Sequence, residues 1–578
     1  MKIKEFNNVN GNIYGKDALC EVREIESIRD MLLSSFELYK DNVAYLVKDS
    51  LKAPYREIKY SEVEQDVYNL ATALWNEGLN DKRIAVIGEN SYEWEITYLS
   101  VVCGTGTIVP IDKELPQEEI NNLLQRANAS AIVFSEKIYA KHTEFIDGLE
   151  GIKTFCMAEN EKHKSLKTLI EEGKALREEG HKEFDEAEVL PDDVDILLFT
   201  SGTTGNAKAV MLSHKNIASN LMNMCAMINI PPEYRFFSLL PLHHTYECTC
   251  GFLCPLYRGS SIAFCQGLKY LQKNMQEAKP TICLAVPMIV EAMYDKIMKE
   301  IKKKGKEKVV KIAMKASNGL LKLGVDMRAK LFAEVREALG GRLEVFVSGA
   351  APGNPEALKF FRGVGIYAIQ GYGLTETSPI VGVNRLGKFD DMAAGIPVPE
   401  VEVKISEPDA DGVGEIIARG DNIMKGYYEN EEATNEAIKD GWFYTGDLGY
   451  LKDGFIYITG RKKDVIITAN GKNVYPENVE KYLNGIEYVK ESMVYAAKDE
   501  KGNDTVVSAL IVPDYDVISE KFGEGVSDTA INDLFDKEIK TVNTLMPSYQ
   551  AIKEFTVRKE PLIRTTTQKI KRFANLPK

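Results

Sequence analysis

The stretch LLFTSGTTGNAKAV, Leu197–Val210, decides how this chain is interpreted. An apolar run typical of a strand ends in six consecutive small residues, Thr200 to Gly205, and Lys208 follows. Glycines let backbone N–H groups turn toward an anion, hydroxyls add donors, and the lysine adds positive charge. The pattern predicts a loop that cradles phosphates at the end of a strand, with a second strand (AVML) after it.

This loop differs from the P-loop of nucleoside triphosphatases. That loop has four residues between two glycines and then Gly-Lys-Ser/Thr, whereas Gly202 and Gly205 are separated by two residues and Lys208 follows Ala207. A flexible surface loop is the alternative, but it leaves the placed lysine and the following strand unexplained. We therefore expect a nucleotide-binding loop of another kind.

Two further apolar runs also end in glycine-rich loops. They are EVFVSGAAP (Glu344–Pro352) and IYAIQGYGLTETSP (Ile366–Pro379). Ligands of open α/β sheets bind beyond the carboxyl ends of the strands, so the three loops are expected to converge on one nucleotide. Tyr372 offers a ring to stack on a base, and Glu376 offers an oxygen ligand for Mg²⁺.

The composition indicates a folded protein with more than one domain. The 578 residues are 44% hydrophobic and 27% charged, and a single core rarely grows this large. The net charge of −14 argues against a dedicated nucleic-acid binder. We see neither a signal peptide nor a run of about 20 apolar residues that would span a bilayer.

The nine cysteines fit reduced thiols in the cytoplasm, and we expect Cys248, Cys250 and Cys254 to pack in the core rather than bind zinc.

Strand-like runs alternate with helical patterns in the first part of the chain. Examples are RIAVIGEN near Arg83, SAIVFSE near Ala131 and DILLFTSG from Asp195. This alternation predicts a large α/β domain with parallel sheets. Residues 158–190 are highly charged, and we expect them to form solvated helix and loop.

Later segments predict two smaller parts. Short strands between glycine turns begin at Gly395 and indicate a small β-rich subdomain. After GRKKD (Gly460–Asp464) the pattern changes to α+β, with a Pro-initiated helix at Pro476–Leu483. We expect an N-terminal domain over residues 1–462 and a C-terminal domain over residues 463–578.

A helical segment from Ile289 to Gly340 interrupts the α/β pattern. Met293, Ile297 and Ile301 recur at helical spacing, and the lysine run KKKGKEK (Lys302–Lys308) follows. The lysines suit a solvated helix end, or a basic patch that faces an acidic partner or an anionic membrane surface. Both interpretations stay open.

Four segments together resemble the adenylate-forming superfamily of acyl-CoA synthetases, adenylation domains and luciferases. They are TSGTTGNAK, GYGLTETSP, YTGDLGY and GRKKDVIITANGKNVYPENVE. The similarity covers nearly the whole chain in matching order and spacing. It implies that a carboxylic acid is activated with ATP and Mg²⁺ as an acyl-AMP, with release of pyrophosphate, and is then passed to a thiol such as that of coenzyme A.

The resemblance assigns the nucleotide site position by position. The loop for the ATP β- and γ-phosphates corresponds to Thr200, Ser201, Gly202, Thr203, Thr204, Gly205 and Lys208. Thr200 and Glu376 match positions that hold Mg²⁺. The adenine is walled by Gly349, Ala350, Gln370, Gly371 and Tyr372, and Thr375 contacts the α-phosphate. Asp447 accepts hydrogen bonds from both ribose hydroxyls, and Arg461 helps to hold the nucleotide.

In the family the C-terminal domain is mobile and carries a catalytic lysine, which corresponds to Lys569. A compact cation lowers the repulsion between the α-phosphate and the substrate carboxylate. Many members have Gly-Lys here; this chain has Gln568-Lys569, as the long-chain branch tends to have. The pivot corresponds to Lys463. The loop with Gly471, Lys472 and Asn473 lines the channel for the thiol, which attacks as thiolate.

The resemblance also bears on the acid and the thiol. LPLHHTYECTCGFLCPLYRG (Leu240–Gly259) is similar to the segment that lines the acyl and thiol channel, and His244 matches its histidine. A hydrogen-bonded core histidine is the alternative. The insertion from Met293 to Leu339 resembles the long-chain branch, so we expect a long-chain fatty acid.

Three functions are weighed. A fatty acid–coenzyme A ligase is expected. An acyl–acyl carrier protein ligase is an alternative, because the lysine run and the basic tail (Arg558, Lys559, Arg564, Lys571 and Arg572) suit either acceptor. A catalytically silent nucleotide- or lipid-binding protein is disfavoured, because no motif is degraded. We expect a cytoplasmic protein and leave open a peripheral contact with the inner face of the membrane.

Overall fold

The computed structural model describes residues 2–6, 14, 19–200, 207–468, 471–498, 505–565 and 569–577. The chain forms two compact units. The first comprises Met1–Val403, Ala418–Phe443 and Asp453–Phe455, and the second comprises Lys404–Ile417, Tyr444–Lys452 and Ile456–Lys578. The second unit thus includes much of the β-rich part as well as the C-terminal residues. A functional boundary between residues 462 and 463 stays a prediction.

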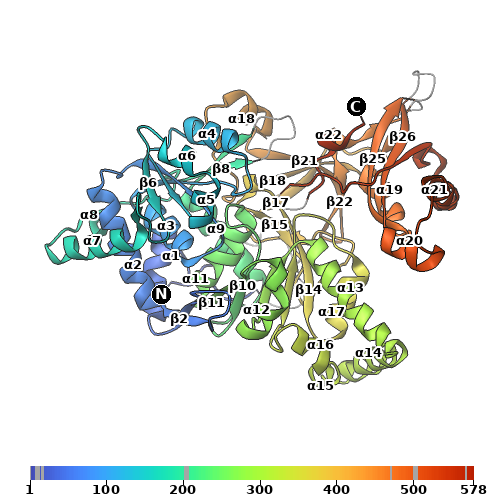
Figure 1. Cartoon of the computed structure of the whole chain (residues 1–578), viewed down its shortest axis with the longest axis horizontal. Coiled ribbons are helices and arrows are strands. Elements are labelled where there is room, and N and C mark those ends of the chain that lie inside the picture. Colours follow the sequence, from blue (N-terminus) through green and yellow to red (C-terminus); the bar gives the residue numbers. More distant parts are fainter. Residues whose placement is uncertain are drawn as a thin grey trace. The chain divides into compact units, whose positions relative to one another are not determined.

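One sheet of the first unit has eight strands in the order β19-β9-β8-β4-β3-β5-β6-β7 (Figure 1). Their bounds are β3 Lys82–Ile87, β4 Gly106–Pro110, β5 Ala131–Phe134, β6 Lys153–Cys156, β7 Lys164–Ser165, β8 Ile196–Thr200, β9 Lys208–Leu212 and β19 Gly426–Tyr427. The strands from β8 to β7 are parallel, whereas β8–β9 and β9–β19 are antiparallel. The predicted strands near Arg83, Ala131 and Asp195 are confirmed.

The charged segment 158–190 is less solvated than expected. It contains α7 (Leu166–Glu178), which buries Leu166, Leu169 and Gly173. This helix packs closely on α2 (Tyr60–Asn76), because a Cβ on Gly173 would lie 1.8 Å from the Asn69 carbonyl oxygen. Three small or apolar residues on one face dock this charged helix, most other residues of the segment are exposed or partly exposed, and the predicted helix and loop are confirmed.

A second sheet of the first unit has nine strands in the order β16-β15-β14-β13-β12-β10-β11-β1-β2. Their bounds are β1 Val43–Val47, β2 Arg56–Lys59, β10 Arg235–Ser238, β11 Ser261–Phe264, β12 Ile282–Ala285, β13 Val345–Ser348, β14 Tyr367–Gly373, β15 Ile380–Val383 and β16 Ile396–Pro397. Its middle is parallel and fully buried, as expected for strands covered on both faces. The three loops that we predicted to converge therefore leave two different sheets.

The predicted helical insertion is confirmed. It contains α13 (Pro287–Lys303), α14 (Glu307–Lys322), α15 (Arg328–Leu331) and α16 (Ala333–Ala338). Met293 and Ile301 of α13 are buried, whereas α14 buries only Ser317. In Figure 1, α14 lies at the outer edge of the first unit.

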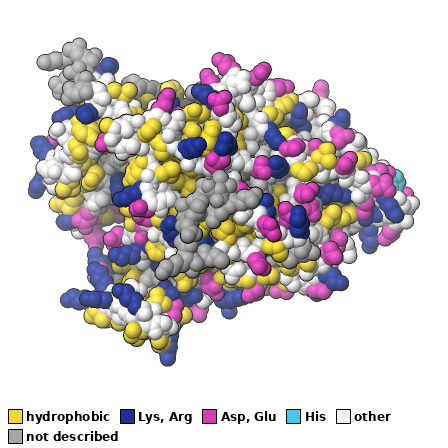
Figure 2. All heavy atoms as spheres, turned by 180° about the vertical axis from the view of Figure 1, so that it is seen from behind, with side chains coloured by type: hydrophobic (Ala, Val, Ile, Leu, Met, Phe, Trp, Pro, Cys, Tyr) yellow, Lys and Arg dark blue, Asp and Glu magenta, His cyan; other side chains and the backbone are white. Residues whose placement is uncertain are grey.

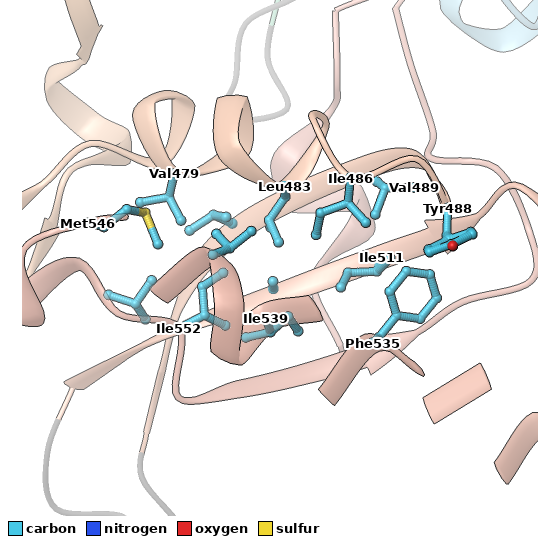
Figure 3. Packing of buried hydrophobic residues seen from close by; sticks show 14 of the residues in the cluster. Val479, Leu483, Ile486, Tyr488, Val489, Ile511, Phe535, Ile539, Met546 and Ile552 are labelled. Carbon is cyan, nitrogen blue, oxygen red and sulfur yellow. The ribbon is translucent and has the colours of Figure 1, made fainter. Parts of the chain in front are cut away.

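The second unit has its own core. The antiparallel pair β25 (Val489–Lys498) and β26 (Thr505–Pro513) is joined in parallel by β27 (Glu554–Val557). The helices α19 (Pro476–Leu483) and α21 (Asp528–Asn543) cover this sheet and enclose the hydrophobic cluster of Figure 3. The Pro-initiated helix is confirmed at the predicted residues.

The β-rich part forms a five-stranded sheet. Its strands are β17 (Glu402–Ser406), β18 (Gly414–Arg419), β20 (Ile438–Lys439), β21 (Trp442–Lys452) and β22 (Phe455–Arg461). The expected fold class, a large α/β domain with a β-rich part and a C-terminal α+β domain, is confirmed. Among the described helices, none is long and apolar enough to cross a bilayer.

Candidate active site

The predicted phosphate loop connects the two strands of an antiparallel hairpin. Thr200, the last residue of β8, pairs with Lys208, the first of β9. The Thr200 hydroxyl donates to the Lys208 carbonyl at 3.2 Å. Because β8 is parallel to β4, the connection leaves from the carboxyl edge of the sheet. Ser201, Gly202, Thr203, Thr204 and Gly205 lie outside the described residues.

A polar array stands beside this hairpin. Nζ of Lys208 lies 4.7 Å from the centre of the Tyr427 ring, a cation–π contact. The Tyr427 hydroxyl donates to Oε1 of Glu376 at 2.9 Å. Tyr427 reaches this position because β19 pairs with β9, with Tyr427 opposite Val210. The structure therefore links Lys208 to Glu376 through one aromatic side chain.

The turn that carries Glu376, η4 (Thr375–Thr377), is held by buried amides. Nδ2 of Asn220 donates to the Ile380 carbonyl at 2.8 Å. Nδ2 of Asn422 donates to the carbonyl of the last residue of the turn at 3.0 Å. Both amides are fully buried, and each donates to the carbonyls of both Thr377 and Ile380. These contacts fix the backbone from which the Glu376 carboxylate projects.

The loop after β13 and the strand β14 are tied together by Gln370. Its Oε1 accepts the Gly353 N–H at 2.7 Å, and its Nε2 donates to the Asp391 carbonyl at 2.9 Å. Gln370 is buried, so its side chain positions the loop. Gly371 and Tyr372 do not begin a loop as predicted: β14 continues through them and pairs with β15.

The start of the loop after β13 has little space. A Cβ on Gly349 would lie 2.9 Å from the Tyr246 ring. Ala350 follows with a φ of 73°, a conformation that L residues adopt rarely. The hydroxyl of Tyr246 donates to the Val347 carbonyl at 3.0 Å. The close approach of the Tyr246 ring to the backbone therefore explains the glycine at position 349.

The two histidines of the predicted channel segment stack, with ring centres 4.0 Å apart. His243 Nε2 lies 3.5 Å from an Asp112 carboxylate oxygen without hydrogen-bond geometry. Burial lowers the pKa of His243 to about 3, so its ring is neutral at physiological pH. His244 precedes α10 (Thr245–Glu247), and its carbonyl accepts the Cys248 N–H at 2.9 Å.

The chain continues from α10 into a π-helical turn, η2 (Cys248–Leu253). Such turns are frequent at functional sites. Glu247 is fully buried, and burial raises the pKa of its carboxyl to about 8. Its Oε2 has no hydrogen-bond partner among the described residues. Gly251 provides the space, because a Cβ there would lie 2.7 Å from the Glu247 carboxyl carbon. The thiols that we expected in the core are buried and free: Cys248, Cys250 and Cys254.

In the second unit, Asp447 and Arg461 form a pair. Asp447 lies on β21 and Arg461 ends β22, and the Arg461 Nε is 2.7 Å from Asp447 Oδ1. The Asp447 side chain is 7% exposed and that of Arg461 36%. The backbone N–H of Asp447 donates to the Thr445 hydroxyl at 3.1 Å. An aspartate oriented in this way is suited to accept hydrogen bonds from a diol.

The predicted pivot and thiol loop follow in sequence. Lys463 lies in the turn η5 (Lys462–Asp464), where burial lowers its pKa. A short hairpin joins β23 (Ile466–Ile467) to β24 (Asn473–Val474). Gly471 has a φ of 69°, which favours glycine, and the Lys472 N–H donates to the Thr468 hydroxyl at 3.2 Å.

Lys569 is exposed. Its backbone N–H donates to the Thr565 hydroxyl at 3.1 Å, and its carbonyl accepts the Thr565 N–H at 2.8 Å. An isolated bridge between Arg564 and Ile570 flanks these two bonds. Gln568 lies outside the described residues.

Sequence reasoning missed Tyr427, the amides of Asn220 and Asn422, and the buried Glu247. Tyr427 stands far along the chain from Lys208 and Glu376, and its only signal is a glycine before two tyrosines. The asparagines donate hydrogen bonds to carbonyls that are distant in the sequence, and no local pattern predicts such contacts. Glu247 had a usable signal, because it is a lone carboxylate in an otherwise apolar and cysteine-rich run.

Comparisons with known proteins agree with this geometry. The profile described as "AMP-binding enzyme" matches residues 35–428. Long-chain-fatty-acid–CoA ligase FadD15 of Mycobacterium bovis is 27% identical over 555 residues, which cover 90% of each chain.

Two solved structures share the fold. The anthranilate CoA ligase AuaEII in complex with anthranoyl-AMP is 20% identical, with a TM-score of 0.75 over 95% of this chain and 96% of that one. ATP-bound MatB from Rhodopseudomonas palustris is 21% identical, with a TM-score of 0.70 over 94% and 98%. Because the family profile covers more than half of the chain, this protein belongs to the family of AMP-binding enzymes.

Proposed function

We propose that this chain is an AMP-forming acid–thiol ligase that activates a long-chain fatty acid with ATP and transfers the acyl group to coenzyme A. The observation that carries the proposal is the array of Lys208, Tyr427 and Glu376 beside the β8–β9 hairpin. It supplies a cation and a carboxylate at the edge of a sheet where nucleotides bind. The name of the Mycobacterium bovis relative supports the choice of acid.

The first unit is assigned most of the ATP site. Thr200 to Gly205 and Lys208 bind the β- and γ-phosphates, Thr375 contacts the α-phosphate, and Tyr372 stacks on adenine between Gly349, Ala350, Gln370 and Gly371. Backbone donors and one lysine suit a polyphosphate because the N–H dipoles point toward the phosphate oxygens and the ammonium offsets their negative charge. His244 is assigned to the wall of the acyl channel.

The residues present fit a magnesium ion. Glu376 accepts one hydrogen bond from Tyr427 and retains lone pairs for a cation, and the Thr200 hydroxyl donates to a carbonyl, which leaves its oxygen as a ligand. The described residues contain no group of three or more His, Cys, Asp or Glu that could hold a metal. Mg²⁺ bound through substrate phosphates needs only one or two protein ligands. When bound, it neutralises phosphate charge.

The second unit is assigned the ribose contact and the catalytic cation. Asp447, oriented by Arg461, accepts from the ribose hydroxyls. Lys569 bridges the α-phosphate and the fatty acid carboxylate. A carboxylate oxygen attacks the α-phosphorus and pyrophosphate leaves; then a thiolate attacks the acyl carbon and AMP leaves.

The domain from residue 463 is assigned as the mobile part. It pivots at Lys463 between the two steps, so that Gly471, Lys472 and Asn473 replace Lys569 beside the acyl-AMP. Lys463 is exposed in the turn η5, which suits a residue whose surroundings change when the domain moves.

Coenzyme A is favoured over an acyl carrier protein as the acceptor because the basic tail is largely neutralised within the second unit. Arg564 pairs with Glu491 at 3.0 Å, and Lys559 pairs with Asp528 at 2.8 Å. Arg572 pairs with Glu480 at 2.7 Å. A surface whose cations are already paired attracts an acidic carrier weakly. A cytoplasmic location, where ATP and coenzyme A are available, is part of the proposal.

The test is product analysis with both acceptors. The chain is incubated with ATP, Mg²⁺, a panel of fatty acids of increasing length and either coenzyme A or a phosphopantetheinylated carrier protein. Acyl-CoA, AMP and pyrophosphate are expected, with the highest kcat/KM for long chains. Release of ADP would refute the ligase, and product on the carrier but not on coenzyme A would reassign the acceptor.

A further inference from the structure

The helix α14 has two apolar faces, only one of which is used by the fold. The inner face packs on α17 (Pro355–Gly363), since a Cβ on Gly363 would lie 2.1 Å from the Met314 terminal methyl. The outer face carries Val309, Ile312 and Leu320, which recur at helical spacing. Val309 is 63% exposed, Ile312 69% and Leu320 38%.

The apolar surface continues beyond the helix. The turn after α14 exposes Leu323 by 78% and Val325 by 47%. We name the outer face of α14 with this turn the α14 patch: Val309, Ile312, Leu320, Leu323 and Val325. Monomeric proteins rarely leave neighbouring large aliphatic side chains this open unless the surface binds something apolar.

Lysines line one edge of the α14 patch. Lys308, Lys311 and Lys315 recur at helical spacing next to the apolar residues and are exposed. Residues 302–330 contain ten Lys or Arg and two Asp or Glu, in a chain of net charge −14. Figure 2 shows dark-blue side chains gathered beside hydrophobic ones where α14 projects at the lower left. The local charge is therefore opposite to that of the chain.

Few of these lysines are neutralised by neighbours. Lys306 lies 3.3 Å from Glu334, which also pairs with Lys304. The described residues contain no ion pair for Lys308, Lys311 or Lys315 within 4.0 Å. Positive charge thus remains on the same edge as the exposed aliphatic residues.

From this combination we infer that the α14 patch docks on an anionic lipid surface. Lysines alone would suit any polyanion. A nucleic acid or a purely acidic protein surface, however, would not bury the exposed side chains of Ile312 and Leu323. An amphipathic helix that lies in a membrane interface buries its apolar face at the acyl boundary while lysines reach the phosphates. The inference does not depend on the proposed function, because binding is measured without catalysis.

Vesicle flotation with the full chain tests the inference. We expect binding to phosphatidylcholine vesicles that contain phosphatidylglycerol, weak binding to pure phosphatidylcholine, and a decrease at high ionic strength. The variant K308E/K311E/K315E should bind anionic vesicles at least about 100-fold more weakly, because each lysine near such a surface contributes roughly 1 kcal/mol. The variant V309S/I312S/L320S should lose roughly 10-fold.

The matched control is K167E/K174E/K182E, which makes the same change in charge at exposed lysines of and beside α7. It should bind like the unmodified chain. Adenylation of a water-soluble short acid should be equal in all four proteins, which separates surface binding from the ligase. Absent binding to anionic vesicles, or equal loss in the control and the α14 variants, would overturn the inference.

Discussion

The two lysines proposed to act in the reaction have opposite surroundings. Lys208 begins a strand of an eight-stranded sheet, and its ammonium lies over the ring of the buried Tyr427. Lys569 is exposed, and its backbone N–H donates to the Thr565 hydroxyl beside an isolated bridge. Under the proposed roles, the difference teaches that a cation that only binds phosphate is fixed in advance, whereas one that joins two substrates is exposed on its own unit.

Replacing Lys569 tests the exposed side of this comparison and has the largest expected effect on a reaction rate. Lys569→Ala should lower the rate of acyl-AMP formation about 100- to 1,000-fold, or about 3 to 4 kcal/mol, because the cation acts in the transition state. Formation of acyl-CoA from synthetic acyl-AMP should persist. Single-turnover assays of each half-reaction measure the two effects.

The matched control is Lys571→Ala, an exposed lysine two residues further on. It should leave both half-reactions near normal, and neither variant should change the free energy of unfolding by more than about 0.5 kcal/mol. Equal losses in both half-reactions for Lys569→Ala would contradict the assignment.

The protonation state of Glu247 tests whether water is excluded from the interior of the first unit next to the His244 segment. Its folded pKa of about 8 lies above the unfolded value, so the folded protein holds a proton that the unfolded chain releases. Stability attributable to this group is full below about pH 4.5 and is lost as pH rises to about 8, by about 1.4 kcal/mol per pH unit. Glu247→Gln should flatten this dependence, which urea unfolding between pH 5 and 8 measures. Parallel pH profiles for the two proteins would argue against a protonated carboxyl.

Replacing Lys208 tests the fixed side of the comparison. Lys208→Ala should raise the KM for ATP roughly 10- to 100-fold, because a charged contact to phosphate contributes about 1.5 to 3 kcal/mol. The free energy of unfolding should fall by about 0.5 to 1 kcal/mol as the cation–π contact is lost. Lys215→Ala, on α9 (His214–Met227), is the control and should change neither quantity by as much. A kcat defect without a change in KM would place Lys208 in the chemical step instead.

Removing the Tyr427 hydroxyl should have the smallest effect. Tyr427→Phe keeps the ring under Lys208 but removes the hydrogen bond to Glu376. The cost should be about 1 kcal/mol, seen as a roughly fivefold higher Mg²⁺ requirement. Tyr428→Phe is the neighbouring control, since that hydroxyl contacts Arg83 instead. Equal Mg²⁺ titrations of Tyr427→Phe and the unmodified chain would separate Tyr427 from the metal site.

Much of the fold could be predicted because its signals are local. The strands near Arg83 and Ala131 are apolar runs of strand length, and the helix Pro476–Leu483 has a proline at its first position. The division into two sheets could not be predicted, because it depends on which strands pair. For the same reason Gly371 and Tyr372 continue β14, although their sequence favours a loop.

The hairpin that carries the proposed phosphate loop could be predicted from one segment. The hairpin from Thr200 to Lys208 has its pattern within nine residues. Tyr427 was not predicted as a site residue, because only the pairing of β19 with β9 brings it to Lys208 and Glu376. Residues that position others are set by tertiary contacts, whereas the residues proposed to bind phosphate share a local sequence pattern.

The measurement that tests the central claim most directly is ATP–pyrophosphate exchange by the full chain without any thiol. With Mg²⁺ and a long-chain fatty acid, labelled pyrophosphate should enter ATP, because acyl-AMP formation is reversible. Exchange should require the acid and should be lost in Lys569→Ala. Absence of acid-dependent exchange, or release of ADP in its place, would contradict the claim that this chain forms an acyl adenylate.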